Sequence, residues 1–413
     1  MAQQTIVIGG GIIGLSIAVT LQKRGADIML IDAAALGMGA SYGNAGHLAA
    51  EQVYPVADSS ILKQLPAMLT DPLGPLRIDW RYLPKLAPWL WQTLLNMRPS
   101  ECARIHRALL AINSRCMADW HSFATEWKLQ QHVHFQGSLL VCEKSSTAEM
   151  LRQQSNTLNE IGVRNQWLQS AEVLAREPSL SPRHQGALLY PDTGHITDLP
   201  AVTEQLRRAF TDAGGQIREY CTVKNAGFDS NGKIALDTET GRFYAEKVIL
   251  CAGAHSKALA RQLTGISVPL DTERGYHLML PEEKQRLSIP VASADRRFII
   301  TPMSGGLRLA GTVEYAGLAA PPNMDRARRL LPLAQGMLTK PLNTAGISEW
   351  MGFRPTTSDS LPVIDRHRNV FLAFGHQHLG LTQAATTAKA IAALYFDEAS
   401  ALDLQPYRLH RFA

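Results

Sequence analysis

The chain has 413 residues, of which 46% are hydrophobic and 19% are charged, so its composition is that of a globular protein with room for two domains. Its net charge of +5 is small and evenly spread, which argues against nucleic acid as a partner. The five cysteines include no Cys-x-x-Cys pair and no apolar run reaches about 18 residues, so we expect no metal site, reduced thiols in the cytoplasm, no signal peptide and no membrane-spanning helix.

The first residues predict a nucleotide-binding turn between a strand and a helix. An apolar strand over 5–8 runs into Gly9-Gly10-Gly11-Ile12-Ile13-Gly14 and a helix that ends at Arg24. In a dinucleotide site of this G-x-G-x-x-G spacing, Gly9 permits the tight turn, Gly11 the approach of a pyrophosphate and Gly14 the packing of helix on strand. The helix N-terminus, at Ile12 and Ile13, attracts the phosphates.

A second apolar strand, 27–31, ends on Asp32. A carboxylate at this position accepts hydrogen bonds from the ribose hydroxyls of an adenosine. The next residue, Ala33, begins an alanine run without the arginine that a 2′-phosphate favours. A glycine-rich turn with no ligand is the alternative, but the strand, helix and acid in this order argue against it.

The next 95 residues contain a small-residue loop and a helical stretch. The loop, 37–46, lets main chain lie flat against a ligand and includes Ser41, Asn44, Ala45 and Gly46. The stretch 62–127 is predicted to be helical and broken by prolines. These prolines are Pro66, Pro72, Pro75, Pro84 and Pro88, and the tryptophans among them are Trp80, Trp89, Trp91, Trp120 and Trp127.

Seven basic residues and two acidic ones lie between Arg77 and Arg115. A basic amphipathic surface with tryptophans suits a membrane interface. Tryptophans that fill the core of a domain are the alternative interpretation.

The rest of the chain alternates predicted strands and helices. We expect strands over 138–142, 216–223, 233–237, 247–250, 275–280, 297–300, 306–311 and 370–374, and helices that end near 158, 176, 213, 338 and 395. The strand 247–250 is expected to be wholly buried and ends in a small-residue turn at Gly253. Ligands bind at the carboxyl ends of such strands in doubly wound sheets, although a core strand with a plain turn is equally compatible.

Two further motifs lie near the C-terminus. The first is Gly352-Phe353-Arg354-Pro355, and the second is G-H-Q-H-L-G-L-T over 375–382, between a strand and a helix. With the earlier landmarks, these motifs resemble the flavin-dependent D-amino acid oxidase superfamily, and within it the bacterial D-amino acid dehydrogenase small-subunit group. The resemblance covers essentially the whole chain.

The resemblance implies an α/β fold, in which a Rossmann-like FAD-binding domain of the glutathione-reductase type carries an inserted α+β mixed-sheet substrate domain. We expect the FAD-binding domain over 1–55, 168–262 and 349–413, and the substrate domain over 56–167 and 263–348. Glycine-rich loops at both ends of the chain suit an extended FAD. The cofactor contacts that the resemblance implies are Gly9, Gly11, Ile12, Ile13, Gly14, Asp32, Ala33, Ser41, Asn44, Ala45, Gly46, Val223, Gly253, Gly375, His378, Leu379, Gly380 and Thr382.

In that family the arginine of G-F-R-P binds the substrate carboxylate, which makes Arg354 the first catalytic candidate. A planar guanidinium grips a carboxylate through two hydrogen bonds and so fixes the Cα–H toward the flavin. A surface arginine is the alternative. The loop 375–382 resembles the one that meets the flavin ring, where Gln377 and His378 face the substrate; for His378 pocket and scaffold roles stay open.

The segment Arg274-Gly275-Tyr276-His277 resembles the strand on the substrate side of the flavin. Alternate residues of a strand point to opposite faces, so only one of Tyr276 and His277 can reach the substrate. Phe298 falls where the oxidases place a carboxylate-binding tyrosine. Arg354 therefore needs another partner, for which Tyr276, His47 and Tyr54 are candidates.

The resemblance implies oxidative deamination of a D-amino acid, in which hydride passes from Cα to FAD and a 2-oxo acid and ammonia form. It implies electron transfer to a quinone-type acceptor, with peripheral contact to the cytoplasmic membrane. A secondary or cyclic amino acid such as sarcosine, glycine, D-proline or D-hydroxyproline is an alternative substrate. A non-catalytic flavin-binding subunit of a larger complex is an alternative of another class. The sequence leaves the oligomeric state open.

Overall fold

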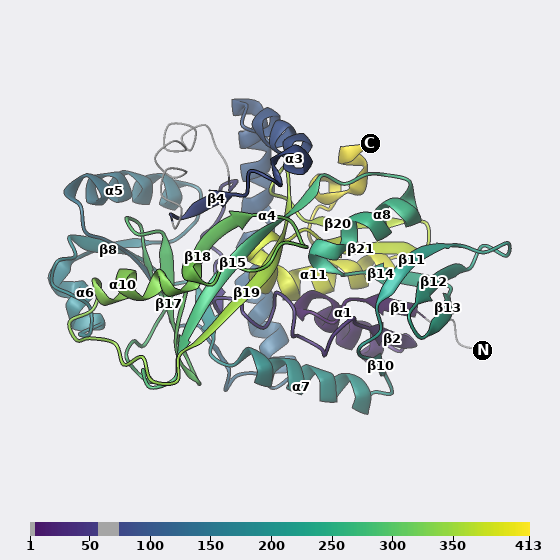
Figure 1. Ribbon diagram of the computed structural model, residues 1–413, viewed down its shortest axis with the longest axis horizontal. Helices are drawn as coiled ribbons and strands as arrows, with labels where there is room; N and C mark the ends of the chain where they lie inside the picture. The colour runs from purple at the N-terminus through teal and green to yellow at the C-terminus, as the bar shows by residue number, and fades with distance from the viewer. Residues whose placement is uncertain (1–4, 57–73) are drawn as a thin grey trace.

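The computed structural model describes residues 5–56 and 74–413, and Figure 1 shows two sheets side by side with helices around them. The first sheet has six strands in the order β10-β2-β1-β14-β21-β20, from three separate stretches of the chain. β20 is antiparallel to β21, and the other pairs are parallel. The strands are β1 (Thr5–Ile8), β2 (Ile28–Ile31), β10 (Gln216–Arg218), β14 (Lys247–Leu250), β20 (Val363–His367) and β21 (Val370–Phe374).

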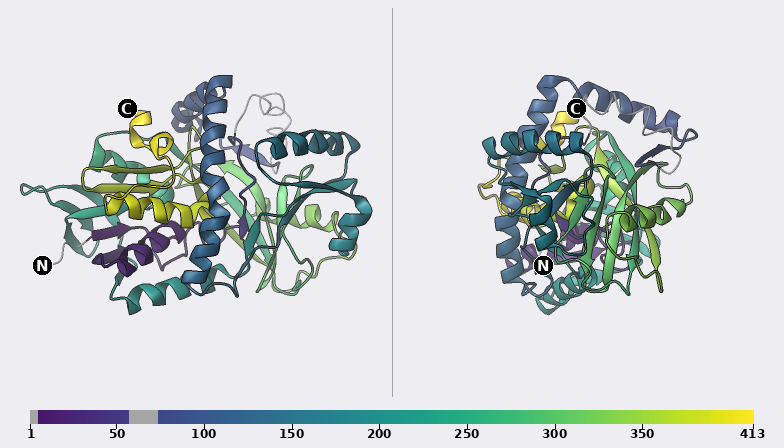
Figure 2. Two further views of the ribbon diagram at one scale, coloured as in Figure 1. Left: turned by 180° about the vertical axis from the view of Figure 1, so that it is seen from behind. Right: turned by 90° about the vertical axis from the view of Figure 1, so that its left-hand side faces the viewer.

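Short apolar runs form the centre of this sheet. β1, β2 and β21 are buried at every position, as expected for parallel strands that are covered on both faces. Helices α1 (Ile12–Lys23) and α11 (Gly380–Tyr395) pack against each other, and Figure 2 shows them as the purple and yellow helices. Each follows a parallel strand, so both helix N-termini lie at the carboxyl edge of the sheet, where α/β proteins bind ligands.

The second sheet is mixed and has nine strands in the described residues, in the order β19-β15-β18-β17-β16-β6-β8-β7 with β4 beside β18. Helices α9 (Asp325–Arg328) and α10 (Leu330–Gln335) pack on β15 and β18, while α5 (Ser145–Glu160) and α6 (Ser170–Arg176) pack on β7 and β8. The strands are β4 (Leu76–Ile78), β6 (Ser138–Cys142), β7 (Gln166–Gln169), β8 (Gly186–Tyr190), β15 (Leu270–Leu280), β16 (Val291–Ser293), β17 (Phe298–Met303), β18 (Gly306–Tyr315) and β19 (Ser348–Thr357).

Smaller elements link and flank the two sheets. One three-stranded sheet has the order β3-β9-β5 and another the order β11-β12-β13. The long helix α4 packs on α11, and Figure 2 shows it upright between the two sheets. The remaining elements are β3 (His47–Leu48), β5 (Val133–His134), β9 (Gly194–Ile196), β11 (Val223–Phe228), β12 (Ile234–Thr238), β13 (Gly241–Ala245), α3 (Leu83–Asn96), α4 (Pro99–Glu126), α7 (Leu199–Asp212) and α8 (Ser256–Thr264). None of the helices in the described ranges is long and apolar enough to cross a membrane.

The expected α/β class is confirmed, and several element predictions are corrected. The strand expected over 216–223 is two strands, because the chain turns at Tyr220 with a φ of +55° and leaves the first sheet. Pro88 lies inside α3 rather than ending it, and the helix expected over 326–338 is split into α9 and α10. Pro66, Pro72 and the start of the stretch at 62 lie outside the described residues.

Two strands, β8 and β19, do not follow the domain division that was expected from the sequence. That division places β8 and β19 in the FAD-binding domain. β8 pairs with β6 and β7, and β19 pairs with β15 along its whole length, so both lie in the nine-stranded sheet. β19 carries the G-F-R-P motif, and the arginine of that motif therefore reaches the site from the second sheet.

Candidate active site

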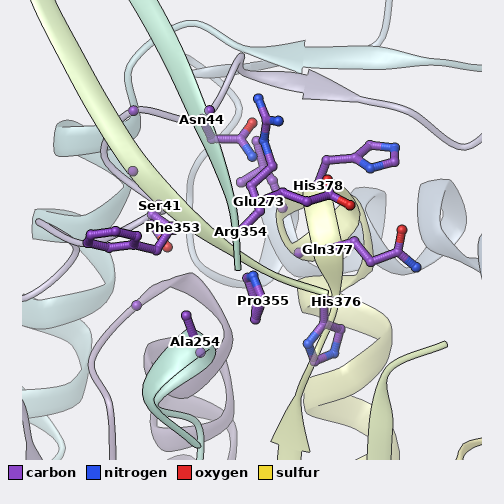
Figure 3. A pocket seen from close by; sticks show the side chains of 18 of the residues that line it. Ser41, Asn44, Ala254, Glu273, Phe353, Arg354, Pro355, His376, Gln377 and His378 are labelled. Atoms are coloured by element: carbon purple, nitrogen blue, oxygen red, sulfur yellow. The ribbon is translucent and has the colours of Figure 1, made fainter. Parts of the chain in front are cut away.

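A cavity of about 1170 Å³ lies between the two sheets and is lined by both. Its volume exceeds the range of about 300–1,000 Å³ that is usual for small-molecule sites, as a dinucleotide together with a substrate requires. The N-terminal glycine turn lines it, and so do the motifs near the C-terminus. Figure 3 shows the region around Arg354, where side chains from β15, β19 and the segment after β21 meet.

The glycine turn has the geometry that its spacing predicts. Gly9 has a φ of +105°, and a Cβ on it would collide with the carbonyl of Cys251. A Cβ on Gly14 would collide with the Gly9 carbonyl, so Gly14 sets the distance between α1 and β1. Gly11 is the N-cap residue of α1, and the Ile12 N–H donates to Ser41 Oγ at 2.9 Å. The positive end of α1 thus lies at the cavity wall, where it favours phosphate.

Asp32 closes this turn from the end of β2. Its Oδ2 accepts a hydrogen bond from the Gly10 N–H at 2.6 Å, and its Oδ1 accepts one from the Ala34 N–H at 2.8 Å. Burial raises the pKa of the Asp32 carboxyl, and these two donors oppose the rise. Asp32 also lines the cavity, so its carboxylate is held in place beside the site predicted for the adenosine ribose.

Arg354 lies flat against the neighbouring strand. A Cβ on Gly275 of β15 would collide with the Arg354 guanidinium, so the glycine leaves the room that the side chain occupies. Arg354 Nη1 donates to the Thr312 carbonyl at 3.2 Å. Burial lowers the pKa of Arg354, and the charge of Glu273 opposes this. The guanidinium is therefore held at the cavity wall with donors left for a ligand.

Glu273 is the charged partner of Arg354, and no motif or spacing in the sequence points to it. The two residues face each other in the register of β15 and β19, and Figure 3 shows their side chains together. Glu273 is buried, and its Oε1 accepts a hydrogen bond from Tyr315 Oη at 2.9 Å. Burial raises the pKa of Glu273, while Arg354 is the largest influence that lowers it.

A second polar group forms around His47 and His378. His47 Nε2 lies 3.2 Å from Ser138 Oγ and 3.9 Å from Glu51 Oε1. His378 Nε2 lies 3.1 Å from Gln52 Oε1. Burial lowers the pKa of each imidazole to about 4 and raises the pKa of Glu51 to about 7. The two histidines are therefore neutral at pH 7.

The comparisons with known proteins agree with this geometry. A family model described as FAD dependent oxidoreductase matches residues 4–394. The chain is 33% identical to a D-amino-acid oxidase of Bradyrhizobium diazoefficiens over 98% of both chains, and 27% identical to a D-amino acid dehydrogenase of Vibrio cholerae over 94% of both.

The chain belongs to the FAD dependent oxidoreductase family. Among solved structures, glycine oxidase from Geobacillus kaustophilus matches it with a TM-score of 0.77 and 23% identity over 100% of both chains, a likeness of fold. FAD is the cofactor of the family, and the cavity between the two sheets has the glycine turn, the helix end and the acid that it requires.

The four predicted catalytic residues, Arg354, His47, His378 and Tyr276, all line the cavity, but the hydroxyl of Tyr276 has partners within the fold. The Tyr276 hydroxyl donates to Glu314 Oε2 at 2.6 Å and accepts from the Asn323 N–H at 3.2 Å. Its ring belongs to the apolar core of the nine-stranded sheet. Tyr276 as a substrate contact therefore stays a prediction, and alternation along β15 puts its side chain on the face opposite Gly275.

The structure also defines the positions of His277, Phe298 and Tyr54. His277 is on the same face as Gly275, but its ring stacks on Trp350 and its Nδ1 lies 3.0 Å from the Gly43 carbonyl. Phe298 lines the cavity, as does Tyr54, whose ring stacks on His106.

Thirteen of the predicted cofactor residues line the cavity, and five are not among its lining residues. The five are Gly14, Gly46, Gly375, Leu379 and Thr382. Leu379 is part of the core, and the Thr382 hydroxyl accepts a hydrogen bond from the Ala49 N–H at 2.9 Å. The thirteen are Gly9, Gly11, Ile12, Ile13, Asp32, Ala33, Ser41, Asn44, Ala45, Val223, Gly253, His378 and Gly380.

Gln377 and His378, in the segment after β21, are the two residues expected to face the substrate, and their side chains have different partners. Gln377 has a φ of +51°, and its Nε2 donates to the Ser360 carbonyl. Its amide is therefore used inside the fold, although Gln377 still lines the cavity. His376 Nε2 lies 3.0 Å from Thr387 Oγ1, which is a scaffold contact. Within 5–56 and 74–413, no three His, Cys, Asp or Glu side chains gather as metal ligands.

Proposed function

We propose that this protein oxidises the Cα–N bond of a D-amino acid and that the product is a 2-oxo acid and ammonia. The observation that carries the proposal is Arg354, a largely buried guanidinium at the wall of a cavity whose other end is a dinucleotide turn. Two relatives that match nearly the full chain are a D-amino-acid oxidase and a D-amino acid dehydrogenase.

Arg354 binds the substrate carboxylate through paired, charge-assisted hydrogen bonds. Thr312 and Glu273 hold the guanidinium from the protein side, so little side-chain freedom is lost on binding. His47 and His378 are neutral, and they add no positive charge that would repel the substrate ammonium.

The amine loses its proton to solvent before oxidation, and no protein base is required. Bound FAD would supply the acceptor for the hydride that leaves Cα, because a flavin provides the redox chemistry that side chains lack. The imino acid is then hydrolysed by water. The protein contributes position and exclusion of bulk solvent.

A quinone-type acceptor at the cytoplasmic face of a membrane is the destination that we propose for the electrons. Trp80 and Trp91 are 62% and 64% exposed, and Leu94 on α3 is 45% exposed, beside the exposed charges of Arg81 and Lys85. Exposed tryptophans next to basic residues favour anionic interfaces.

Other tryptophans of the same stretch have a core role. Trp89 is 6% exposed and its Nε1 donates to the Thr356 carbonyl at 3.0 Å, and Trp120 donates to the Leu381 carbonyl. Sedimentation with anionic vesicles tests the surface: wild-type protein pellets, and a variant with Trp80→Ser and Trp91→Ser stays in the supernatant. A wild-type protein that does not pellet contradicts membrane contact.

Product analysis tests the reaction itself. The FAD-loaded enzyme is incubated with D-alanine, L-alanine, sarcosine, glycine and D-proline, with either oxygen or a soluble quinone as acceptor. We expect pyruvate and ammonia from D-alanine and reduction of the quinone. Turnover confined to sarcosine, glycine or D-proline would replace the D-amino acid by a secondary or cyclic one, and turnover with oxygen alone would contradict the quinone.

A further inference from the structure

Glu51 is a buried carboxylate that the reaction described above does not use. It follows β3 and lines the cavity, and its side chain is 10% exposed. Its Oε2 has no hydrogen-bond partner within the part of the chain that the structure describes. Buried polar groups are nearly always paired, and an unpaired carboxylate carries a large desolvation penalty. An oxygen left in this state beside a cavity is suited to a ligand.

Within residues 5–56 and 74–413, the groups found against Glu51 carry no positive charge at pH 7. His47 Nε2 is 3.9 Å from Glu51 Oε1, and burial lowers the pKa of His47 to about 4, so its imidazole is neutral at pH 7. The side chain of Gln52 forms a hydrogen bond to the Glu51 carboxylate, and Tyr190, also at the cavity wall, is close enough for the Glu51 charge to raise its pKa. These partners are uncharged, so the negative charge of Glu51 is not balanced by them.

Two histidines connect Glu51 with Arg354 along the cavity wall. His378 and Arg354 both line the cavity, and after burial the positive charge of Arg354 is the next cause that lowers the pKa of His378. His47 in turn contacts Glu51. The wall therefore has a positive group at Arg354, neutral imidazoles at His378 and His47, and at Glu51 a carboxyl group that a bound cation would keep ionised. A ligand that matches this order has a carboxylate at one end and a cation at the other.

We propose that Glu51 binds a cationic group at the end of the substrate side chain, which makes basic D-amino acids of the lysine or ornithine type the preferred substrates. This inference rests on the proposed function, because it takes the α-carboxylate to be held by Arg354. The cation pairs with the carboxylate oxygen that has no partner among the described residues. Neutral side chains of the same length leave that oxygen unpaired and bind less well.

Ligand binding without turnover separates this site from the chemistry. Calorimetry on the FAD-loaded protein compares 6-aminohexanoate with hexanoate, neither of which has an α-amino group to oxidise. We expect wild-type protein to bind 6-aminohexanoate roughly 10- to 100-fold more tightly, as for a hydrogen bond to a charged group. In Glu51→Gln the difference disappears. In Glu149→Gln, a change of an exposed acid on α5, the difference remains.

Steady-state kinetics with D-lysine and D-norleucine extend the test to the substrate. The kcat/KM ratio of D-lysine to D-norleucine falls by roughly 10- to 100-fold in Glu51→Gln, with D-norleucine nearly unchanged. An equal loss for both substrates overturns the inference, because it places Glu51 at the α-amine. Equal binding of 6-aminohexanoate and hexanoate by the wild type also overturns it. Selective binding without oxidation of any amino acid supports the Glu51 site and rejects the proposed function.

Discussion

The guanidinium of Arg354 occupies the space that a Cβ on Gly275 would fill. The two residues lie on neighbouring strands, and their motifs are about 80 residues apart in the chain. From the sequence, Gly275 is expected only to lie on the strand at the substrate side of the flavin. The structure gives it a different role, because Gly275 makes room for the arginine that we expect to bind the substrate.

Gly275→Ala tests this role. The φ of Gly275 is not in the left-handed region, so the backbone itself accepts alanine. The added methyl must displace the guanidinium, and we expect KM for a D-amino acid to rise at least about 10-fold, the loss of one hydrogen bond to a charged group. FAD content is expected to stay unchanged. Gly227→Ala on β11, which meets no atom within 4 Å, is the matched control. Unchanged KM in Gly275→Ala contradicts the assignment.

Asp32→Ala tests the nucleotide end of the cavity. The change removes the acceptor of the Gly10 and Ala34 N–H groups as well as the carboxylate expected at the ribose. We expect a flavin-to-protein ratio after gel filtration that is less than half that of the wild type. For Asp32→Asn, which keeps one acceptor oxygen, we expect a flavin-to-protein ratio between those of Asp32→Ala and the wild type. If Asp32→Ala retains FAD fully, Asp32 does not contribute to cofactor binding and the assignment is contradicted.

Tyr276→Phe separates a core role from a catalytic one. The Tyr276 hydroxyl donates to Glu314, which is buried, so its loss leaves a carboxylate with one donor fewer. We expect the free energy of unfolding to fall by about 1–3 kcal/mol and kcat/KM to stay within a factor of about two of the wild type. Denaturant unfolding and steady-state kinetics measure the two effects. A kcat/KM loss above 10-fold with unchanged stability would instead support Tyr276 as a substrate contact.

The stability of the protein is expected to depend on Glu51 and pH. Burial raises the pKa of Glu51 from its ordinary value of 4.5 to about 7 in the folded state. Between these values the native state holds a proton that the unfolded chain has released, so stability falls as pH rises through this window. The groups that face Glu51 are His47, neutral here, with Gln52 and Tyr190.

Glu51→Gln removes this pH dependence. At pH 5 the variant and the wild type are expected to unfold at similar denaturant concentrations. At pH 8 the variant is expected to be more stable by about 1–3 kcal/mol, the linkage value for a shift of this size. Equal stability at pH 8 contradicts a buried charge at Glu51.

Local sequence signals predicted the cofactor half of the molecule. The glycine spacing from Gly9 to Gly14, the acid at Asp32 and the apolar runs of β1 and β14 each depend on contacts within a short segment. Arg354 was also predicted, because its motif resembles a family motif. The structure confirms these elements of the fold and places Arg354 at the cavity.

The residues that the sequence did not reveal depend on pairing between distant strands. Glu273 is an acid in a strand, and only the register of β15 against β19 puts it opposite Arg354. The face to which Tyr276 points is likewise fixed by that register. Glu51 stands alone in a loop, with no spacing that signals a site, and its burial results from the packing of β3 against the rest of the cavity wall.

Anaerobic mixing of the FAD-loaded enzyme with a D-amino acid tests the central claim most directly. We expect the yellow flavin colour to bleach with the D-enantiomer and not with the L-enantiomer. Arg354→Met is expected to require at least about 10-fold more substrate for the same bleaching, because the bidentate contact is lost. A flavin that stays oxidised with every D-, cyclic and N-alkyl amino acid, or an Arg354→Met variant that bleaches at wild-type substrate concentrations, would contradict the account.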